Sequence, residues 1–313
     1  MNRPSPDRRW DVLCIGDPCA DLMIEVDGWP PLGGKCTGRP LGTQAGGTAS
    51  NVACAVARLG GRAAALGPVG DDANGALLRA SFDDFGVDCR YVTNVAGQAS
   101  SSVAVMLAPG GERTIVYMPM RAPPLDAAAL RAAIEAARAV YVMPYDLDEL
   151  VRIAGIARGT GALVAIDLER AVASNSVEMH RRIAQADIVF FNEDGFVAAT
   201  GQQPNAGTLA ALLDEGPRVV VVTLGASGAM AADKTGFAMQ PSFACPVVDT
   251  TGAGDSFNAA WLVAFLEGEP IDRALRFACA AASFAVGSVG ARPGLPDREK
   301  VELRLQNGVT ATR

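Results

Sequence analysis

Short, continuous apolar runs alternate with longer helical patterns through most of this chain, and this alternation limits the possible folds more than any other feature. The apolar runs lack the polar alternation of half-exposed strands, so we predict buried strands at residues 11–15, 62–66, 139–143, 162–166, 187–191 and 218–223. Segments rich in Ala and Leu lie between them, and their spacing predicts helices at residues 73–85, 126–138 and 147–158. A repeated strand–helix order predicts an α/β fold in three layers, with a mostly parallel central sheet and helices on both faces.

Two regions break the alternation. Residues 21–42 hold short strand-like pieces separated by the sequence GWPPLGG, and residues 100–117 read as two strands joined by a turn at residues 109–112. Neither region has a helix of its own, so the two could pair into a small antiparallel sheet that stands off the main domain. The alternative is a region of loops that decorates that domain.

Charge and histidine content exclude several classes of function. The chain has 27 Lys and Arg against 34 Asp and Glu, a formal net charge of -7, whereas a surface for nucleic acid needs the opposite sign. A single histidine leaves no basis for a His-centred zinc site or a Ser-His-Asp relay. The P-loop pattern G-x-x-x-x-G-K-[ST] does not occur, and the dinucleotide pattern G-x-G-x-x-G fails at Gly252 because Phe257 takes its last position.

Cysteine content and hydropathy indicate in which cellular compartment the protein is expected. The seven cysteines form an odd, scattered set without a C-x-x-C pair, which is typical of reduced thiols in a chain of this size. The first ten residues are charged and interrupted by proline, and no apolar segment follows them, so no secretory signal is expected. No stretch approaches the roughly 18 uninterrupted apolar residues of a membrane span. We therefore expect a cytoplasmic protein without a membrane partner.

The strongest local motif is DTTGAGDSF at residues 249–257, which leads into a helical pattern. A Gly-Ala-Gly turn that feeds a helix leaves consecutive N–H groups free to hold an anion at the positive end of the helix dipole. Asp255 would then be a carboxylate beside an anion, where it could act as the general base that takes a proton from a hydroxyl attacking phosphorus. The alternative is that Asp255 only caps the helix.

A second motif, GGTASN, precedes another helical pattern. The pair Gly46 and Gly47, followed by Thr48 as a predicted helix cap, would let a ligand approach the backbone, and Asn51 offers a donor and an acceptor to a hydroxyl. The alternative is a helix start with a buried Asn. Asp17 and Asp21 follow the first predicted strand, at the edge where ligands bind in parallel sheets, and two carboxylates suit a hydroxyl-rich ligand.

Together the two motifs resemble a known family. AGGTASNVACAVARLG at residues 45–60 and DTTGAGDSFNAAWLVAFLEG at residues 249–268 are similar to the two signatures of the ribokinase-like, or PfkB, family of carbohydrate and nucleoside kinases. The similarity extends over about residues 11–300 and includes GPVGDDANG and TLGASG in the expected order. It implies about nine strands in a kinase domain formed by residues 11–20, 43–97 and 121–305, and a β-sheet lid formed by residues 21–42 and 98–120. In many members the lid also joins two subunits, which implies a homodimer.

The resemblance also implies a role for individual residues. Asp255 would be the catalytic base, and the backbone amides of Gly252, Ala253 and Gly254 would form the anion hole. Positions that bind sugar are matched by Asp21, Gly46, Gly47 and Asn51. Positions that hold ATP, its magnesium or its phosphates are matched by Asn192, Thr223, Gly225, Gly228 and Gly254, with Cys279 in the adenine pocket. A loop that relatives fill with potassium is matched by Asp249 and by the carbonyl groups of Thr251, Ala285, Ser288 and Gly290.

Some positions depart from the family pattern. The family motif N-x-x-E, whose Glu organises magnesium, here begins at Asn192 and ends in Gly195, so either Glu193 or Asp194 substitutes through water or metal binding is weaker. Cys19, Thr48 and Tyr145 stand where ribokinase has residues that serve ribose, so D-ribose is not favoured.

The lid and the C-terminal stretch narrow the expected substrate. The sequences GGKCTGRP, GERTIVY and GARPGLPD resemble the ketohexokinase and sulfofructose kinase side of the family. One hypothesis is that Lys35 or Arg39 contacts an anionic or hydroxyl-rich end of a ketose, and the alternative is that both are solvated lid charges.

The expected function is therefore an ATP- and Mg²⁺-dependent kinase that phosphorylates a hydroxymethyl oxygen of a small, ketose-like sugar, with potassium as a possible third cofactor. A nucleoside kinase is one alternative, and it would require an apolar pocket of the size of a base beside the lid. A sugar-responsive regulator without catalysis is another, supported only by Gly195.

Overall fold

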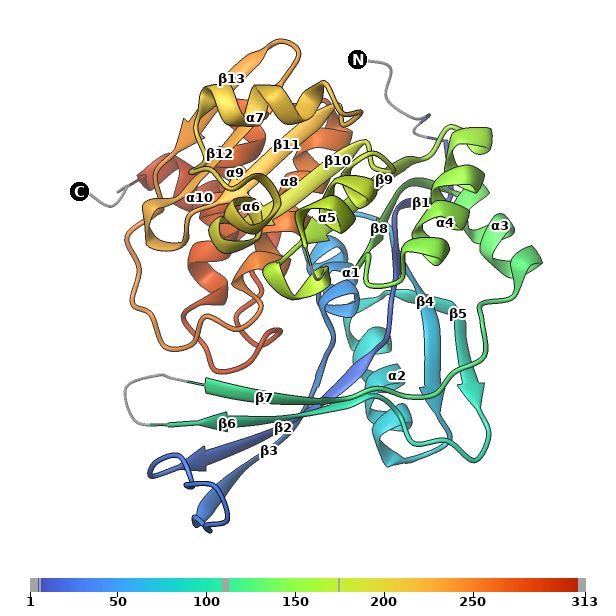
Figure 1. The fold of residues 1–313 in the computed structure, drawn as a ribbon, viewed down its shortest axis with the longest axis vertical. Coiled ribbons are helices and arrows are strands. Elements are labelled where there is room, and N and C mark those ends of the chain that lie inside the picture. The colour runs from blue at the N-terminus through green and yellow to red at the C-terminus, as the bar shows by residue number, and fades with distance from the viewer. Residues whose placement is uncertain (1–4, 6, 109–112, 174, 309–313) are drawn as a thin grey trace.

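A nine-stranded sheet forms the centre of the molecule in the computed structural model, which describes residues 5, 7–108, 113–173 and 175–308 (Figure 1). The strand order is β13-β12-β11-β10-β9-β8-β1-β4-β5, and neighbouring strands are parallel except at one edge, where β12 is antiparallel to both β11 and β13. The strands are β1 (Trp10–Ile15), β4 (Ala63–Gly70), β5 (Asp88–Val95), β8 (Ala137–Val142), β9 (Leu163–Leu168), β10 (Ile188–Asn192), β11 (Val219–Thr223), β12 (Ala229–Asp233) and β13 (Gly236–Gln240). The predicted parallel α/β sheet is confirmed.

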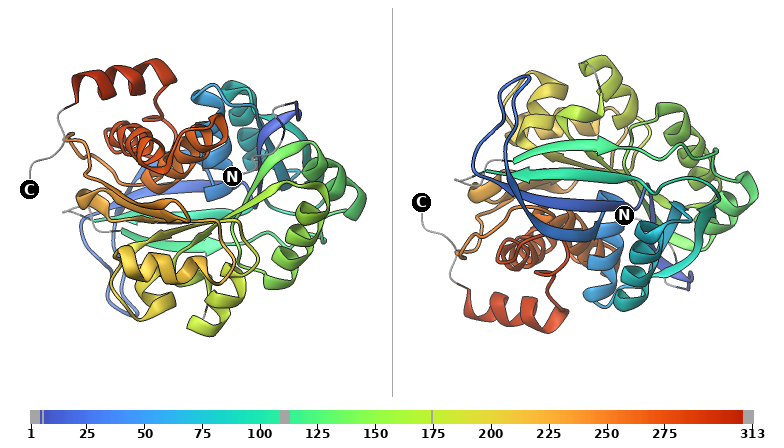
Figure 2. Two further views of the ribbon diagram at one scale, coloured as in Figure 1. Left: turned by 90° about the horizontal axis from the view of Figure 1, so that it is seen from above. Right: turned by 90° about the horizontal axis from the view of Figure 1, so that it is seen from below.

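Helices cover both faces of this sheet (Figure 2). One face packs against α1 (Thr48–Arg58), α2 (Ala73–Phe85), α8 (Ala253–Glu267) and α9 (Ile271–Ala285), and α10 (Arg298–Asn307) lies against α9. The other face packs against α3 (Ala127–Glu135), α4 (Leu147–Thr160), α5 (Ser176–Ile183), α6 (Glu193–Thr200) and α7 (Ala206–Leu213). In β1, Val12 and Cys14 belong to one core and Leu13 and Ile15 to the other, which is why residues 12–15 are apolar without interruption. Among the helices that the structure describes, none is long and apolar enough to cross a membrane.

All six predicted strands are present, with shifted ends. The helix predicted at residues 126–138 ends at Glu135, because the chain turns into β8 at Ala137 and an Ala-rich stretch does not mark that change. Strand β4 continues past its predicted end to Gly70, although Gly67 and Pro68 suggest a turn. A Cβ atom at Gly67 would collide with the carbonyl oxygen of Gly16, so this glycine serves close packing inside the sheet.

The two regions that interrupt the alternation form a second sheet, as predicted. Its order is β3-β2-β6-β7, with β2 (Cys19–Val26), β3 (Gly38–Gly46), β6 (Ser102–Leu107) and β7 (Arg113–Met118), and it projects from one end of the central sheet (Figure 1). The sheet is mixed rather than antiparallel, because β2 and β6, which come from the two separate regions, pair in parallel. The turn predicted at residues 109–112 lies outside the described residues. Strands β2 and β3 reach beyond residues 21–42 at both ends of that range, so the sheet begins inside the expected kinase domain.

Candidate active site

The N-terminus of α8 carries Asp255. The helix begins at Ala253, and its N-cap is Gly252, whose φ of 75° is the left-handed conformation that glycine tolerates. A Cβ atom at Gly252 would lie 2.6 Å from the Cα atom of Ala291, so both the backbone conformation and the neighbouring chain exclude a side chain at this position. Because no side chain caps this helix and Asp255 lies within its first turn, the interpretation of Asp255 as a helix cap is wrong.

Backbone N–H groups at this helix start can receive an anion. In the described structure, the N–H groups of Gly252 and Gly254 donate to no protein group, while that of Ala253 reaches the carbonyl oxygen of Thr250 at 3.3 Å. These N–H groups belong to the positive end of the helix dipole. The turn therefore offers two free donors beside the Asp255 carboxylate.

The Asp255 carboxylate sits in a charged, desolvated environment. Asn51 Nδ2 donates to Asp255 Oδ2 at 2.7 Å. Desolvation raises the pKa of Asp255 to about 7, the charges of Glu169 and Asp21 act in the same direction, and the Asn51 hydrogen bond and the charge of Arg292 oppose them. A carboxylate that titrates near neutrality is suited to general-base work.

The glycine pair before α1 lets two strands approach each other. A Cβ atom at Gly46, the last residue of β3, would collide with the carboxylate of Asp21 in β2. Gly47 has a φ of 90°, and a Cβ there would lie 2.6 Å from the carbonyl oxygen of Asp17. Gly47 itself is the N-cap of α1, so the prediction that Thr48 caps this helix is wrong. Burial raises the pKa of Asp21 to about 6.

The structure brings most of the predicted sugar residues together, but not Lys35. Asp17 Oδ2 accepts a hydrogen bond of 3.1 Å from the hydroxyl of Tyr117 in β7. Lys35 is exposed and lies in the connection between β2 and β3. The other lid cation considered, Arg39, forms an ion pair of 2.7 Å with Glu25 across the same two strands.

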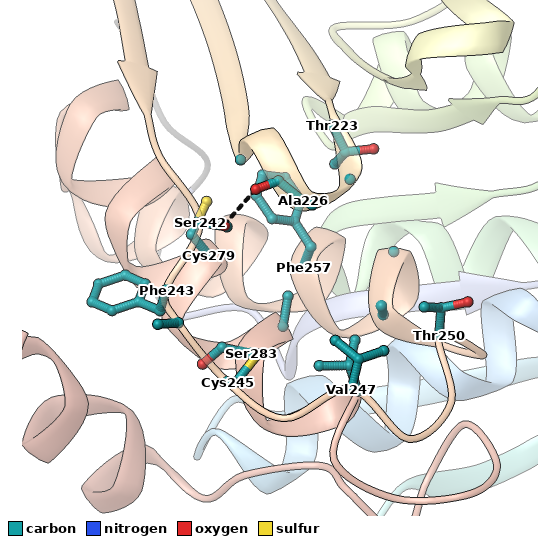
Figure 3. A pocket seen from close by; sticks show the side chains of 17 residues that line it. Thr223, Ala226, Ser242, Phe243, Cys245, Val247, Thr250, Phe257, Cys279 and Ser283 are labelled. Carbon is teal, nitrogen blue, oxygen red and sulfur yellow. Dashed lines mark hydrogen bonds between the residues drawn. The ribbon is translucent and has the colours of Figure 1, made fainter. Parts of the chain in front are cut away.

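A cavity of about 510 Å³ lies on the other side of the α8 N-terminus (Figure 3). Its wall is mostly apolar, with Phe243, Val247 and Phe257 among the lining side chains. The hydroxyl of Ser242 donates to the carbonyl oxygen of Ala226 at 2.6 Å, so this polar group is already occupied. The predicted nucleotide residues that line the cavity are Thr223, Gly225, Gly228, Gly254 and Cys279.

Asn192 does not line this cavity. Its Oδ1 accepts a hydrogen bond of 2.7 Å from the N–H of Gly195, which caps α6. A Cβ atom at Gly195 would collide with the carbonyl oxygen of Leu168 at the end of β9. Position 195 therefore holds a glycine in place of the family glutamate because α6 packs closely on β9, and any side chain at this position would push the helix and the strand apart.

The carboxylates near Asn192 fit a magnesium ion that takes most of its other ligands from phosphate groups and water. Glu193 and Asp194 are exposed in the first turn of α6. No group of three or more Asp, Glu, His or Cys side chains that could hold a metal occurs among residues 5, 7–108, 113–173 and 175–308. Mg²⁺ commonly keeps water and phosphate ligands and needs one or two carboxylates, so one carboxylate suffices.

Asp249 joins two loops at the predicted potassium position. Its Oδ1 accepts hydrogen bonds from the N–H and the hydroxyl of Thr251, at 2.9 and 2.8 Å. Its Oδ2 accepts one of 2.8 Å from the N–H of Gly290. Of the predicted loop residues, Thr251 and Gly290 thus meet at the Asp249 carboxylate, just before the Gly-Ala-Gly turn.

Arg292 is a site residue that sequence reasoning missed. It is buried and donates to Asn51 Oδ1 and to the carbonyl oxygen of Gly46, both at 2.9 Å. Its only signal in the sequence is a charged residue between an Ala and a Pro in a Gly-rich stretch, and that signal does not reveal burial.

Comparison with known proteins gives matches over most of the chain. The family model described as pfkB family carbohydrate kinase matches residues 10–298. A solved structure of Arabidopsis thaliana ribokinase complexed with ribose and ATP is 28% identical, with a TM-score of 0.83 and coverage of 95% of this chain and 99% of that one. Fructokinase-1 of Oryza sativa subsp. japonica is 32% identical, with coverage of 82% of this chain and 86% of that protein. A nucleoside kinase of Methanothermobacter thermautotrophicus is 29% identical, with coverage of 96% of both.

Proposed function

Because this chain belongs to the pfkB family of carbohydrate kinases, we propose that it transfers the γ-phosphoryl group of ATP to a hydroxymethyl oxygen of a small, uncharged, ketose-like sugar. The observation that carries the proposal is the position of Asp255. Its carboxylate is bonded to Asn51 on the sugar side, and the neighbouring Gly254 lines the apolar cavity on the nucleotide side. A base at this junction lies between the acceptor hydroxyl and the phosphoryl donor.

The reaction follows from these groups. Asp21 and Asn51 hold the acceptor hydroxyls, and Asp255 takes the proton of the hydroxymethyl group as its oxygen attacks the γ-phosphorus in line. The new P–O bond forms as the bond to the leaving ADP oxygen breaks, and the proton stays on Asp255. The free amides of Gly252 and Gly254 stabilise the charge that develops on the transferred group.

Two cations belong to this proposal. Magnesium, when bound with the nucleotide, neutralises the phosphate charge. Glu193, through water, is the residue we assign to it, with Asn192 nearby. The Asp249 carboxylate and the carbonyl groups of Thr251, Ala285, Ser288 and Gly290 are suited to a potassium ion, which would order the loop that precedes the anion-binding turn.

The inner face of the second sheet supports an uncharged acceptor. Strand register places Val103 and Tyr117 on the same face as Asp21, and Val105 and Ile115 on that face one pair further along. Ile115 and Tyr117 are about half exposed, at 52% and 50%. Apolar side chains of this kind cover a neutral ligand better than an anionic one, because none of these four residues carries a positive charge that could pair with a buried anion.

The same apolar face favours a nucleoside as a second candidate acceptor. A base needs a flat apolar surface beside the sugar site, and Val103, Val105 and Ile115 supply one next to Asp21. The nucleoside kinase relative is consistent with this alternative. A sugar and a nucleoside are therefore the two acceptors that must be compared directly.

The opposite face of the second sheet supports the expected dimer. Leu22, Val116 and Met118 lie on it and are 40%, 50% and 45% exposed. We propose that two copies pack these faces together, since a contiguous apolar surface of this kind is typical of an interface. Sedimentation at micromolar concentration should show a dimer for the natural protein and a monomer for Val116→Glu, and a natural monomer would contradict the proposal.

The decisive experiment is ADP release from purified protein with MgATP, with and without KCl, against aldoses, ketoses, sugar phosphates, sulfosugars and nucleosides. Turnover with a ketose-like sugar would support the main proposal, and turnover with a nucleoside alone would establish the second candidate. If the protein binds a sugar but releases no ADP with any acceptor, both the sugar kinase and the nucleoside kinase proposals are overturned, and a regulator is favoured.

A further inference from the structure

We propose that Arg292 is a positioning residue for the phosphoryl transfer. Its guanidinium orients the amide of Asn51 so that this amide donates to Asp255 and keeps the carboxylate ready to accept a proton. The inference rests on the proposed function, since it treats Asp255 as the base.

The guanidinium of Arg292 is held on three sides. It lies in the connection between α9 and α10, is 6% exposed, and stacks over the ring of Phe82 in α2 with 5.7 Å to the ring centroid. Its Nη1 donates to the hydroxyl of Ser81 at 2.6 Å and its Nη2 to the carbonyl oxygen of Gly46 at 2.9 Å. These contacts leave its Nε directed at Asn51 Oδ1, 2.9 Å away.

This contact determines which way the Asn51 amide faces. A guanidinium only donates hydrogen bonds, so the atom of Asn51 that meets Arg292 must be the amide oxygen. The amide nitrogen then points to Asp255 Oδ2 at 2.7 Å. If the amide were reversed, two oxygens would face each other at Asp255 and two donors would face each other at Arg292. Arg292 therefore makes Asn51 a donor to Asp255.

A donor at this position favours the ionised form of Asp255, which is the form that can accept a proton. The positive charge of Arg292 has the same effect on Asp255 and on Asp21, because it lies near both in a desolvated region. Two other carboxylates, Glu169 after β9 and Asp21 in β2, oppose this effect, because their charges raise the pKa of Asp255. The remaining titratable groups that face Asp255 are Asp167 in β9, Tyr141 in β8 and Tyr145 after β8, and the charge of Asp255 raises the pKa of each of them.

Arg292 also joins parts of the chain that must act together. Through Gly46 it holds the glycine pair of the sugar side, and Gly290, two residues earlier, is bonded to Asp249 beside the anion-binding turn. A merely structural role is the alternative to be tested, since a buried arginine with several bonds also stabilises the fold.

The test compares Arg292→Gln and Arg292→Lys with a matched control. Arg138→Gln removes another buried arginine, which bonds Asp11 and the carbonyl oxygen of Leu266, at the opposite end of α8 from Asp255. We expect Arg292→Gln to lower kcat about 10- to 100-fold, since acid–base contributions are about 10²–10⁴-fold. We expect the acidic limb of the pH profile to move to higher pH, with partial recovery in Arg292→Lys and no movement in Arg138→Gln.

A double-mutant cycle isolates the route through Asn51. If Arg292 acts through Asn51 as well as by its charge, Arg292→Gln should lower kcat less in the Asn51→Ala background than in the natural protein. Fully additive losses, or an unchanged pH profile in Arg292→Gln, would overturn the inference.

Carboxyl-carbon NMR titration of Asp255 provides a readout that needs no acceptor. The pKa of Asp255 should be higher in Arg292→Gln than in the natural protein, and an equal or lower value would contradict the inference. If the natural protein releases no ADP with any acceptor, the proposed function is wrong. The titration of Asp255 tests the inference about Arg292 separately, so failure of the proposed function and failure of this inference are distinguishable.

Discussion

The two sides of the α8 N-terminus differ in the polarity of their side chains. On the nucleotide side, the cavity wall is apolar, and Ser242, one of its polar side chains, already donates to a backbone carbonyl. On the acceptor side, Asn51 and Arg292 are buried, Asp21 and Asp255 are partly buried, and directed hydrogen bonds connect Arg292, Asn51 and Asp255.

The difference teaches which side controls which step. An apolar wall binds through contact area and shape, so its changes should alter the affinity for nucleotide. Buried charges with directed hydrogen bonds determine protonation states, so changes on the acceptor side should alter the chemical step.

The largest expected effect comes from removing the base. Asp255→Asn keeps the shape of the side chain but cannot accept the proton, so kcat should fall by at least about 10² while the KM for the acceptor stays within several-fold. Steady-state kinetics on protein of unchanged melting temperature would check this. Turnover near that of the natural enzyme would show that Asp255 is not the base.

The protonation state of Asp255 should appear in the pH profile. Since its pKa is raised to about 7 and the reactive form is the ionised one, kcat/KM for the acceptor should rise about tenfold between pH 6 and pH 8 and level off above. The measurement is made at saturating MgATP, with Asp255→Asn as the control that should lack this limb. A profile that falls with rising pH over this range would refute the assignment.

On the nucleotide side, Ala282→Leu should act on binding alone. Ala282 lines the cavity, and an isobutyl group in place of its methyl group costs about 1–3 kcal/mol, so the KM for ATP should rise by about 5- to 150-fold while the KM for the acceptor is unchanged. Ala136→Leu places the same change at a partly buried alanine on the other face and should leave both constants alone. Equal changes in both KM values would show that the two sides are not separable.

Replacing Gly195 with the glutamate of the family motif should destabilise the protein without improving Mg²⁺ binding. Gly195→Glu would force its side chain against the carbonyl of Leu168, so we expect a loss of about 1–3 kcal/mol in unfolding free energy and no tighter Mg²⁺ binding. Gly155→Glu, at an exposed helical glycine with open space around it, is the matched control for thermal unfolding. A stable Gly195→Glu variant with higher Mg²⁺ affinity by calorimetry would contradict this account.

The smallest effects belong to the lid cations. Lys35→Ala and Arg39→Ala should leave the KM for the acceptor within about twofold, because exposed charges of this kind contribute little. Acceptor kinetics for each variant are the test. A tenfold rise for Lys35→Ala would mean that the lid closes on an anionic group.

Much of the fold was predictable, since apolar runs buried on both faces have a direct pattern in the sequence. The parallel pairing of β2 with β6 was not, because no local pattern records which of two distant regions a strand will meet. The start of a helix at the motif around Asp255 was predictable, because glycines before a helical pattern are a local signal, whereas its role as an anion site stays a prediction. The burial of Arg292 and the collision at Gly195 were not, because each depends on a neighbour far away in the chain.

The sequence by itself therefore determined the layers of the fold, the family and the residues able to do the chemistry, because these follow from local periodicity and short motifs. Only the tertiary structure decided how those residues act on one another. The orientation of Asn51, the raised pKa of Asp255 and the close approach of α6 to β9 all depend on distances between segments that meet only when the chain is folded.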